Sequence, residues 1–121
     1  MTLLALAVAG GLGAVARFVL DGVLSERWGT RFPYGILAVN VSGSLLLGLV
    51  AGLVVFTGAP GELRLVVGTG FCGGYTTFST TSVDTVRLAR QGRTAAALAN
   101  AVGTLVLTLL AGATGLLLSR I

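Results

Sequence analysis

The chain has 121 residues, of which 55% are hydrophobic and only 10% are charged, and its formal net charge is +4. This composition excludes an ordinary soluble domain and indicates a protein of the lipid bilayer. The positive balance comes from scarce acids and from arginines in predicted loops, so no nucleic-acid partner is expected, because that would need a basic patch on a soluble surface.

Four largely uncharged stretches are each long enough to cross a bilayer, which takes about 20 apolar residues. They predict transmembrane helices at about residues 3–22, 33–56, 63–87 and 94–119. What remains is too short for a soluble domain, so we interpret residues 1–121 as one all-α, multi-pass unit of the cell (inner or plasma) membrane. The first helix should be retained, because Arg17 follows its apolar run, whereas a signal peptide carries its charge before that run.

Arginines are divided unevenly between the two ends of these helices. With four crossings, the loops before the second and fourth helices share one side, and the opposite side carries only Arg64 and Arg120. The positive-inside rule predicts that the arginine-rich loops are cytoplasmic and that both termini lie outside. The arginine-rich side comprises Arg17, Arg27, Arg31, Arg87, Arg90 and Arg93.

The second and fourth predicted helices each carry small and polar residues at i, i+4 spacing, which places them on one helix face. For the glycines we favour close packing, because small residues let membrane helices approach one another. For the threonines, packing and a polar path are both open, and for the asparagines structural hydrogen bonding is slightly favoured. Polar faces on several helices of so short a chain predict an oligomer. The two faces are Asn40, Ser44, Gly48 and Gly52, and Asn100, Thr104, Thr108 and Gly112.

The third predicted helix is the least suited to face lipid, because glycines and hydroxyl residues fill residues 69–82. Such a helix needs protein or a polar path beside it. We predict a break at Gly73–Gly74, near its middle, which exposes N–H groups on one half-helix and carbonyls on the other. From the pattern alone, packing is the favoured interpretation of Phe78 and of the single cysteine, Cys72.

The polar groups of the predicted helices are hydrogen-bond donors without charge. The chain has no histidine, and no carboxylate lies near the centre of a predicted helix. The sequence therefore predicts no catalytic residue and no enzyme, and a proton-coupled carrier would lack its titratable group. Uncharged donors suit a small, strongly hydrated anion, because they can replace its water shell.

Three motifs stand out along the chain: Gly10-Gly-Leu-Gly-Ala-Val-Ala-Arg17, Gly35-Ile-Leu-Ala-Val-Asn40 and, most specific, Gly70-Phe-Cys-Gly-Gly-Tyr-Thr-Thr-Phe-Ser-Thr80. With these motifs the whole chain resembles the CrcB/Fluc family of fluoride channels. The resemblance implies a dual-topology dimer of two antiparallel four-helix subunits with two fluoride pores. It also implies a function, namely passive efflux that lowers cytoplasmic fluoride.

The resemblance further implies roles for individual residues. A structural sodium ion would be held at the dimer axis by the backbone carbonyls of Gly73 and Thr76, and Arg17 would lie in a vestibule. The residues implied at the pore are Asn40, Phe78, its hydroxyl neighbour Ser79, Asn100, Thr104 and Thr108.

Two features depart from the family pattern. Thr81 stands where a second phenylalanine is usual, so one pore contact is missing, and the arginines are divided more unequally than a dual-topology homodimer needs. Both features fit an antiparallel heterodimer with a homologue of opposite charge bias, and the homodimer stays open. A non-conducting or half-functional subunit of such a channel is a further possibility. A small multidrug-type exporter is less favoured, because it would need an acid inside the membrane.

Overall fold

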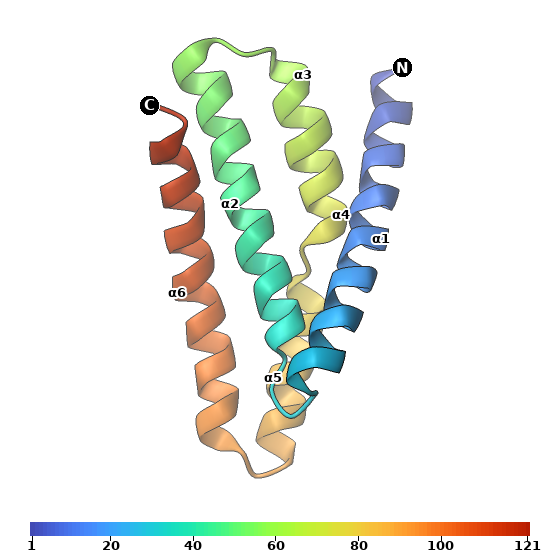
Figure 1. The fold of residues 1–121 in the computed structure, drawn as a ribbon, viewed down its shortest axis with the longest axis vertical. Coiled ribbons are helices and arrows are strands. Elements are labelled where there is room, and N and C mark those ends of the chain that lie inside the picture. The colour runs from blue at the N-terminus through green and yellow to red at the C-terminus, as the bar shows by residue number, and fades with distance from the viewer.

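A computed structural model describes all residues from 1 to 121 as helices joined by short connections (Figure 1). Three of the helices are uninterrupted: α1 (Thr2–Trp28), α2 (Tyr34–Thr57) and α6 (Thr94–Leu118). Each is long and apolar enough to cross a membrane. Only 21 of the 121 residues are buried within the chain, so most of the apolar helix surface faces outward, as contact with lipid or another subunit requires. The chain is therefore a multi-pass membrane protein.

A fourth run of helix, made of two halves, lies between α2 and α6 in the sequence and traverses the bundle (Figure 1). The first half joins α3 (Gly61–Leu63), the π-helix η1 (Arg64–Cys72) and α4 (Gly73–Tyr75) without interruption. The second half is α5 (Phe78–Arg90). π-Helical segments are mostly single turns, so a π-helix of nine residues is unusual. They occur frequently at functional sites.

The break in this third crossing lies at Thr76 and Thr77, so the predicted position at Gly73–Gly74 is wrong. Thr76 has a ψ of 158° and Thr77 has φ and ψ of −149° and 120°, both extended, whereas Gly73 is helical. The two threonines are β-branched and accept an extended backbone readily. Gly74 serves packing instead, because a Cβ there would overlap the Gly10 carbonyl of α1, whereas a Cβ at Gly73 would meet nothing within 4 Å.

Glycines set how closely the long helices approach one another. A Cβ at Gly48 would overlap the Gly112 carbonyl, so α2 and α6 touch there through their backbones, and a Cβ at Gly52 would overlap the side chain of Ser119, just after α6. The close-packing interpretation of these glycines is thereby confirmed. Close packing at a glycine also brings α1 against the third crossing, where a Cβ at Gly13 would overlap the carbonyl of Phe71. Cys72 is only 2% exposed and its thiol is free, as a packing role requires.

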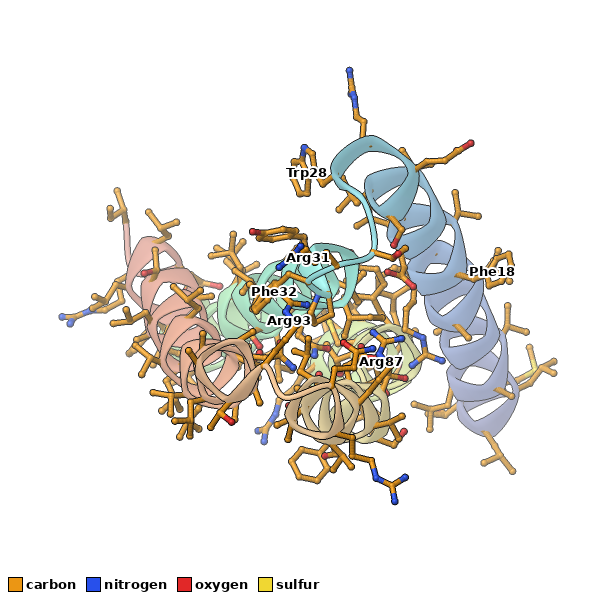
Figure 2. All side chains as sticks on the ribbon, turned by 90° about the horizontal axis from the view of Figure 1, so that it is seen from below. Phe18, Trp28, Arg31, Phe32, Arg87 and Arg93 are labelled. Carbon is orange, nitrogen blue, oxygen red and sulfur yellow. The ribbon has the colours of Figure 1, made fainter.

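Both termini lie at one end of the bundle (Figure 1). The connections 29–33 and 91–93 lie at the opposite end, where Arg93 donates a hydrogen bond to the Arg31 carbonyl (Figure 2). Trp28 and Tyr34 meet there edge to face at 6.1 Å between ring centroids, because α1 extends to Trp28, beyond its expected end near residue 22. Which end faces the cytoplasm stays a prediction from the arginine count.

Candidate functional site

A groove of about 730 Å³ runs along the broken crossing, between α2 and α6. We call it the central groove. Its walls come from α2, both halves of the third crossing and α6. It gathers six of the nine residues that the family resemblance assigned to the pore, the vestibule and the sodium site, and leaves Arg17, Ser79 and Asn100 outside its lining. The six are Asn40, Gly73, Thr76, Phe78, Thr104 and Thr108.

Phe78 is the first residue of α5, and its side chain is 88% exposed on the wall of the central groove. Thr77, the N-cap of α5, accepts a hydrogen bond from the Thr80 N–H at 3.1 Å. The positive end of the α5 dipole therefore lies next to an exposed aromatic ring. Ser79 is exposed, and its hydroxyl lies 3.3 Å from that of Thr77.

Asn40 holds the break in place from α2. Its amide nitrogen donates to the Thr77 carbonyl at 3.1 Å and to the Thr81 hydroxyl at 2.8 Å. Its amide oxygen accepts the Thr77 N–H at 2.8 Å. Asn40 is 6% exposed, so the contacts that stabilise the extended backbone at Thr77 are made away from solvent. This side chain uses both of its N–H groups and its oxygen within the chain.

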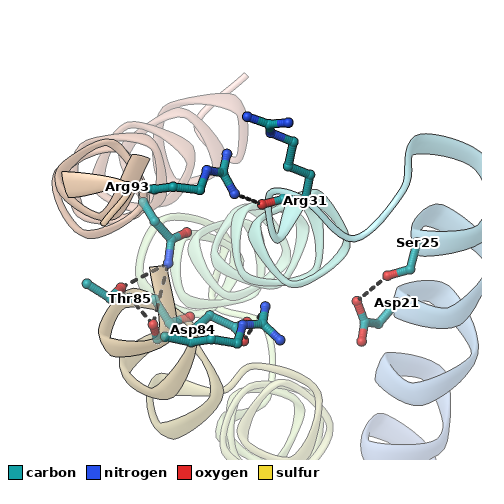
Figure 3. Close-up of polar contacts among 9 residues, drawn as sticks. Asp21, Ser25, Arg31, Asp84, Thr85 and Arg93 are labelled. Atoms are coloured by element: carbon teal, nitrogen blue, oxygen red, sulfur yellow. Dashed lines mark hydrogen bonds and ion pairs between the residues drawn. The ribbon is translucent and has the colours of Figure 1, made fainter. Parts of the chain in front are cut away.

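Asn100 makes an equivalent contact from α6, one turn further along α5. Its amide nitrogen donates to the Thr85 hydroxyl at 2.9 Å and to the Thr81 carbonyl at 3.4 Å (Figure 3). Asn100 is 2% exposed and points at α5 instead of lining the central groove. Structural hydrogen bonding, slightly favoured from the sequence, describes the contacts of both asparagines.

The two threonines of α6 in the groove differ in their hydrogen bonding. Thr108 donates to the Thr104 carbonyl at 2.6 Å, which satisfies its hydroxyl within the helix. The Thr104 hydroxyl is buried and has no partner. An unpartnered buried hydroxyl in a groove wall is a donor held ready for a ligand or water.

Two backbone carbonyls at the break have lost their usual helical partners. The Thr77 N–H, which a continuous helix would give to the Gly73 carbonyl, bonds Asn40 instead. The Thr80 N–H, which would go to the Thr76 carbonyl, bonds the Thr77 hydroxyl. A guanidinium nitrogen of Arg17 donates to the Thr76 carbonyl at 3.3 Å. These oxygens fit a small cation, and at Thr76 a positive charge is already present.

The acidic residues Asp21 and Asp84 lie towards the end that carries the connections 29–33 and 91–93. Asp84 is 9% exposed and pairs with Arg87 at 3.2 Å on the same helix, and Asp21 accepts a hydrogen bond from Ser25 at 3.3 Å (Figure 3). Neither carboxylate lines the central groove. The groove is therefore equipped with uncharged donors and an aromatic ring.

Two residues whose hydroxyls accept hydrogen bonds from the asparagines were not predicted from the sequence. Thr81 stands out there only as a missing phenylalanine, and Thr85 was not a candidate. A signal was present, because Thr77, Thr81 and Thr85 recur at i, i+4 spacing and share one face of the third crossing. Their partners could not be inferred, since they lie on other helices.

Four crossings with the third one broken beside an internal groove define a helical membrane protein built around a polar interruption. The chain belongs to the CrcB-like family, because the pattern described as "CrcB-like protein, Camphor Resistance (CrcB)" matches residues 4–116. The family prediction made from the motifs is confirmed.

Relatives of high identity carry a consistent name. "Fluoride-specific ion channel FluC 1" of Leifsonia xyli subsp. xyli is 56% identical over 116 residues, 96% of this chain and 83% of the relative. "Fluoride-specific ion channel FluC 2" of Nitrobacter hamburgensis is 42% identical over 121 residues, 99% and 98% of the two chains. The protein of the same name from Mycobacterium tuberculosis is 44% identical over 112 residues, 93% and 86% of the two chains.

Proposed function

We propose that this chain is a subunit of a fluoride-specific ion channel that lowers cytoplasmic fluoride by passive efflux. The observation that carries the proposal is the central groove, whose wall contains both Phe78, at the start of α5, and the unpartnered Thr104 hydroxyl. The names of the relatives support fluoride as the ion. The groove lining, which is made of uncharged residues, supports passive movement over proton-coupled transport.

Fluoride must exchange its strongly held water for protein donors in order to pass. Thr104 offers a hydroxyl hydrogen that no other group takes, and the α5 terminus offers the positive end of a helix dipole. The edge of the Phe78 ring is electropositive and adds a third contact. Ser79, Thr108, Asn40 and Asn100 are proposed to shape the path around these groups, with Arg17 near its entrance.

A second subunit of the family, packed antiparallel, is proposed to cover the central groove. Phe78 supports this assembly, since an aromatic ring 88% exposed on a groove wall lacks its packing partner within one chain. The unequal arginine distribution and Thr81 fit a heterodimer with a homologue of opposite charge bias, and a homodimer is the alternative assembly. A non-conducting role for this chain in such a pair is the second candidate, and the presence of Thr81 at the expected phenylalanine position is what favours it.

A structural sodium ion is proposed at the Gly73 and Thr76 carbonyls. Two oxygens from each of two subunits would supply four ligands, and the ion would tie the two breaks together at the axis. The released carbonyls support the site, while the Arg17 contact means that the guanidinium must yield at Thr76 when the ion binds.

Phe78→Leu is expected to lower fluoride efflux from proteoliposomes about tenfold, because a leucine side chain has no electropositive ring edge. Phe18→Leu is the matched control, since Phe18 is also exposed but projects from α1 away from the other helices (Figure 2). Efflux is measured with a fluoride electrode. Equal efflux from both variants in the assembled dimer would instead favour the non-conducting subunit.

Expressing the chain alone separates the two assemblies. A heterodimer predicts little efflux from the pure chain and strong efflux after co-expression with a homologue of opposite loop charge. Robust efflux from the pure chain would establish the homodimer and remove the need for a partner.

Replacing sodium with N-methyl-D-glucamine during purification is expected to abolish most efflux, and restoring sodium is expected to return it. The organic cation is too large for a site between backbone carbonyls. A fluoride-conducting ionophore in identical vesicles controls for effects on the membrane. Undiminished efflux after exhaustive exchange would rule out a sodium ion that the fold requires.

A further inference from the structure

Two asparagines from different helices form the same pattern of hydrogen bonds with the third crossing. Asn40 of α2 donates to the carbonyl of Thr77 and to the hydroxyl of Thr81, four residues later. Asn100 of α6 donates to the carbonyl of Thr81 and to the hydroxyl of Thr85, again four residues later (Figure 3). The two contacts are thus one helical turn apart and follow the same pattern.

Each threonine hydroxyl is itself oriented by the helix. Thr81 donates its hydroxyl hydrogen to the Thr77 carbonyl at 3.1 Å, and Thr85 donates to the Thr81 carbonyl at 2.8 Å. With the hydrogen committed, only a lone pair of each hydroxyl is left to face the neighbouring helix. Each threonine hydroxyl is therefore oriented to accept a hydrogen bond from the asparagine amide that contacts it.

These contacts engage both asparagine amides inside the chain. Asn40 and Asn100 are 6% and 2% exposed, so an amide hydrogen that lost its acceptor would have little access to solvent. Rotating the Asn40 amide to find another acceptor would also take its oxygen away from the Thr77 N–H, which fixes the break.

We propose that Thr81 and Thr85 are positioning residues of the ion path. Thr81 fixes the amide of Asn40, Asn40 fixes the extended backbone at Thr77, and the start of α5 with Phe78 is thereby placed in the central groove. Thr85 and Asn100 hold the next turn of α5 against α6. Thr81 thus has a function of its own at a position where the family pattern has phenylalanine. The effect on conduction rests on the proposed fluoride channel function.

Thr81→Val keeps the shape of the side chain and removes the acceptor. We expect it to lower fluoride efflux per reconstituted protein about tenfold, because one buried amide hydrogen loses its partner and the break loosens. Thr81→Ser keeps the hydroxyl and should restore most of the efflux. Thr114→Val is the control, since its exposed hydroxyl bonds only the Leu110 carbonyl of its own helix. Wild-type efflux from Thr81→Val would overturn the proposal.

A double-mutant cycle tests whether Thr81 acts through Asn40. In the Asn40→Ala background, Thr81→Val should cause no further loss of efflux, since its partner is already gone. Losses that simply multiply would show that Thr81 acts independently, which contradicts a positioning role.

Solvent exchange of the asparagine side-chain amides, followed by NMR, provides a readout that does not depend on conduction. Thr81→Val should expose the Asn40 amide to exchange and leave Asn100 protected, and Thr85→Val should do the reverse. If wild-type protein shows this protection but no fluoride efflux, either alone or after co-expression with a homologue of opposite loop charge, the proposed function fails while the hydrogen-bond network stands. Rapid exchange of both amides in the wild type would overturn the network itself.

Discussion

Gly74→Ala is expected to prevent the chain from forming its helical bundle, whereas Gly73→Ala, one residue earlier, is expected to be tolerated. A Cβ at Gly74 would overlap backbone atoms of Gly10, which cannot move without shifting α1 as a whole. A Cβ at Gly73 would have nothing within 4 Å. Overpacking typically costs about 1–3 kcal/mol, and more where only rigid backbone could yield, which is a large part of the stability of a small domain.

The two variants share their residue type, helix and membrane depth, so the pair isolates close packing from glycine content. The measurement is the amount of monodisperse protein recovered in detergent and its thermal unfolding temperature. Gly73→Ala should retain the thermal unfolding temperature of the helical bundle, because a Cβ there would meet no atom of its own chain within 4 Å. Similar behaviour of the two variants would contradict the close approach of α1 to α4.

Asn40→Ala is expected to lower fluoride efflux about 100-fold and to destabilise the folded chain, because a buried N–H without a partner costs about 1–3 kcal/mol. The substitution leaves the Thr77 N–H in that state and removes two further hydrogen bonds at the break. Without them, residues 76 and 77 lose what holds them extended, and Phe78 loses its position in the central groove.

Thr57→Val is the matched control for Asn40→Ala. Thr57 lies on the same helix, is exposed, and bonds only the Leu53 carbonyl of that helix. Its substitution should leave efflux and thermal unfolding unchanged. The critical comparison is efflux per folded protein. A normal value for Asn40→Ala would show that the amide is dispensable for the ion path.

The sequence predicted the number of crossings, the interruption of the third and the family, because hydrophobic length, charge placement and the Gly-Thr motif are local properties. The interruption itself was placed two to three residues too early. Glycine marks where a helix can bend or be approached, and here Gly74 is needed for approach. The bend occurs where Asn40 supplies partners for Thr77, and a single sequence does not show which side chain from another helix will do so.

The same limit applies to the candidate site. Spacing identified Asn40, Asn100, Thr104 and Thr108 as a polar set, but only the structure shows which of their hydrogen-bond donors already have a partner within the chain. The asparagine amides donate to threonines of α5, whereas the Thr104 hydroxyl has no partner. Whether these residues contact the ion during permeation is a prediction that the efflux measurements test.

The hydrogen bonds between Asn40 and the third crossing bear on the order in which the chain folds during biosynthesis. Asn40 lies on α2, which precedes the third crossing in the chain, so its amide is already in the membrane when Thr77 arrives. Asn100 lies on α6, which is made after α5. The interruption can therefore be set as soon as the third crossing inserts, and α5 gains its hydrogen bonds from Asn100 only when α6 enters the membrane. A chain truncated before residue 94 and released into the membrane should contain the first contact and lack the second.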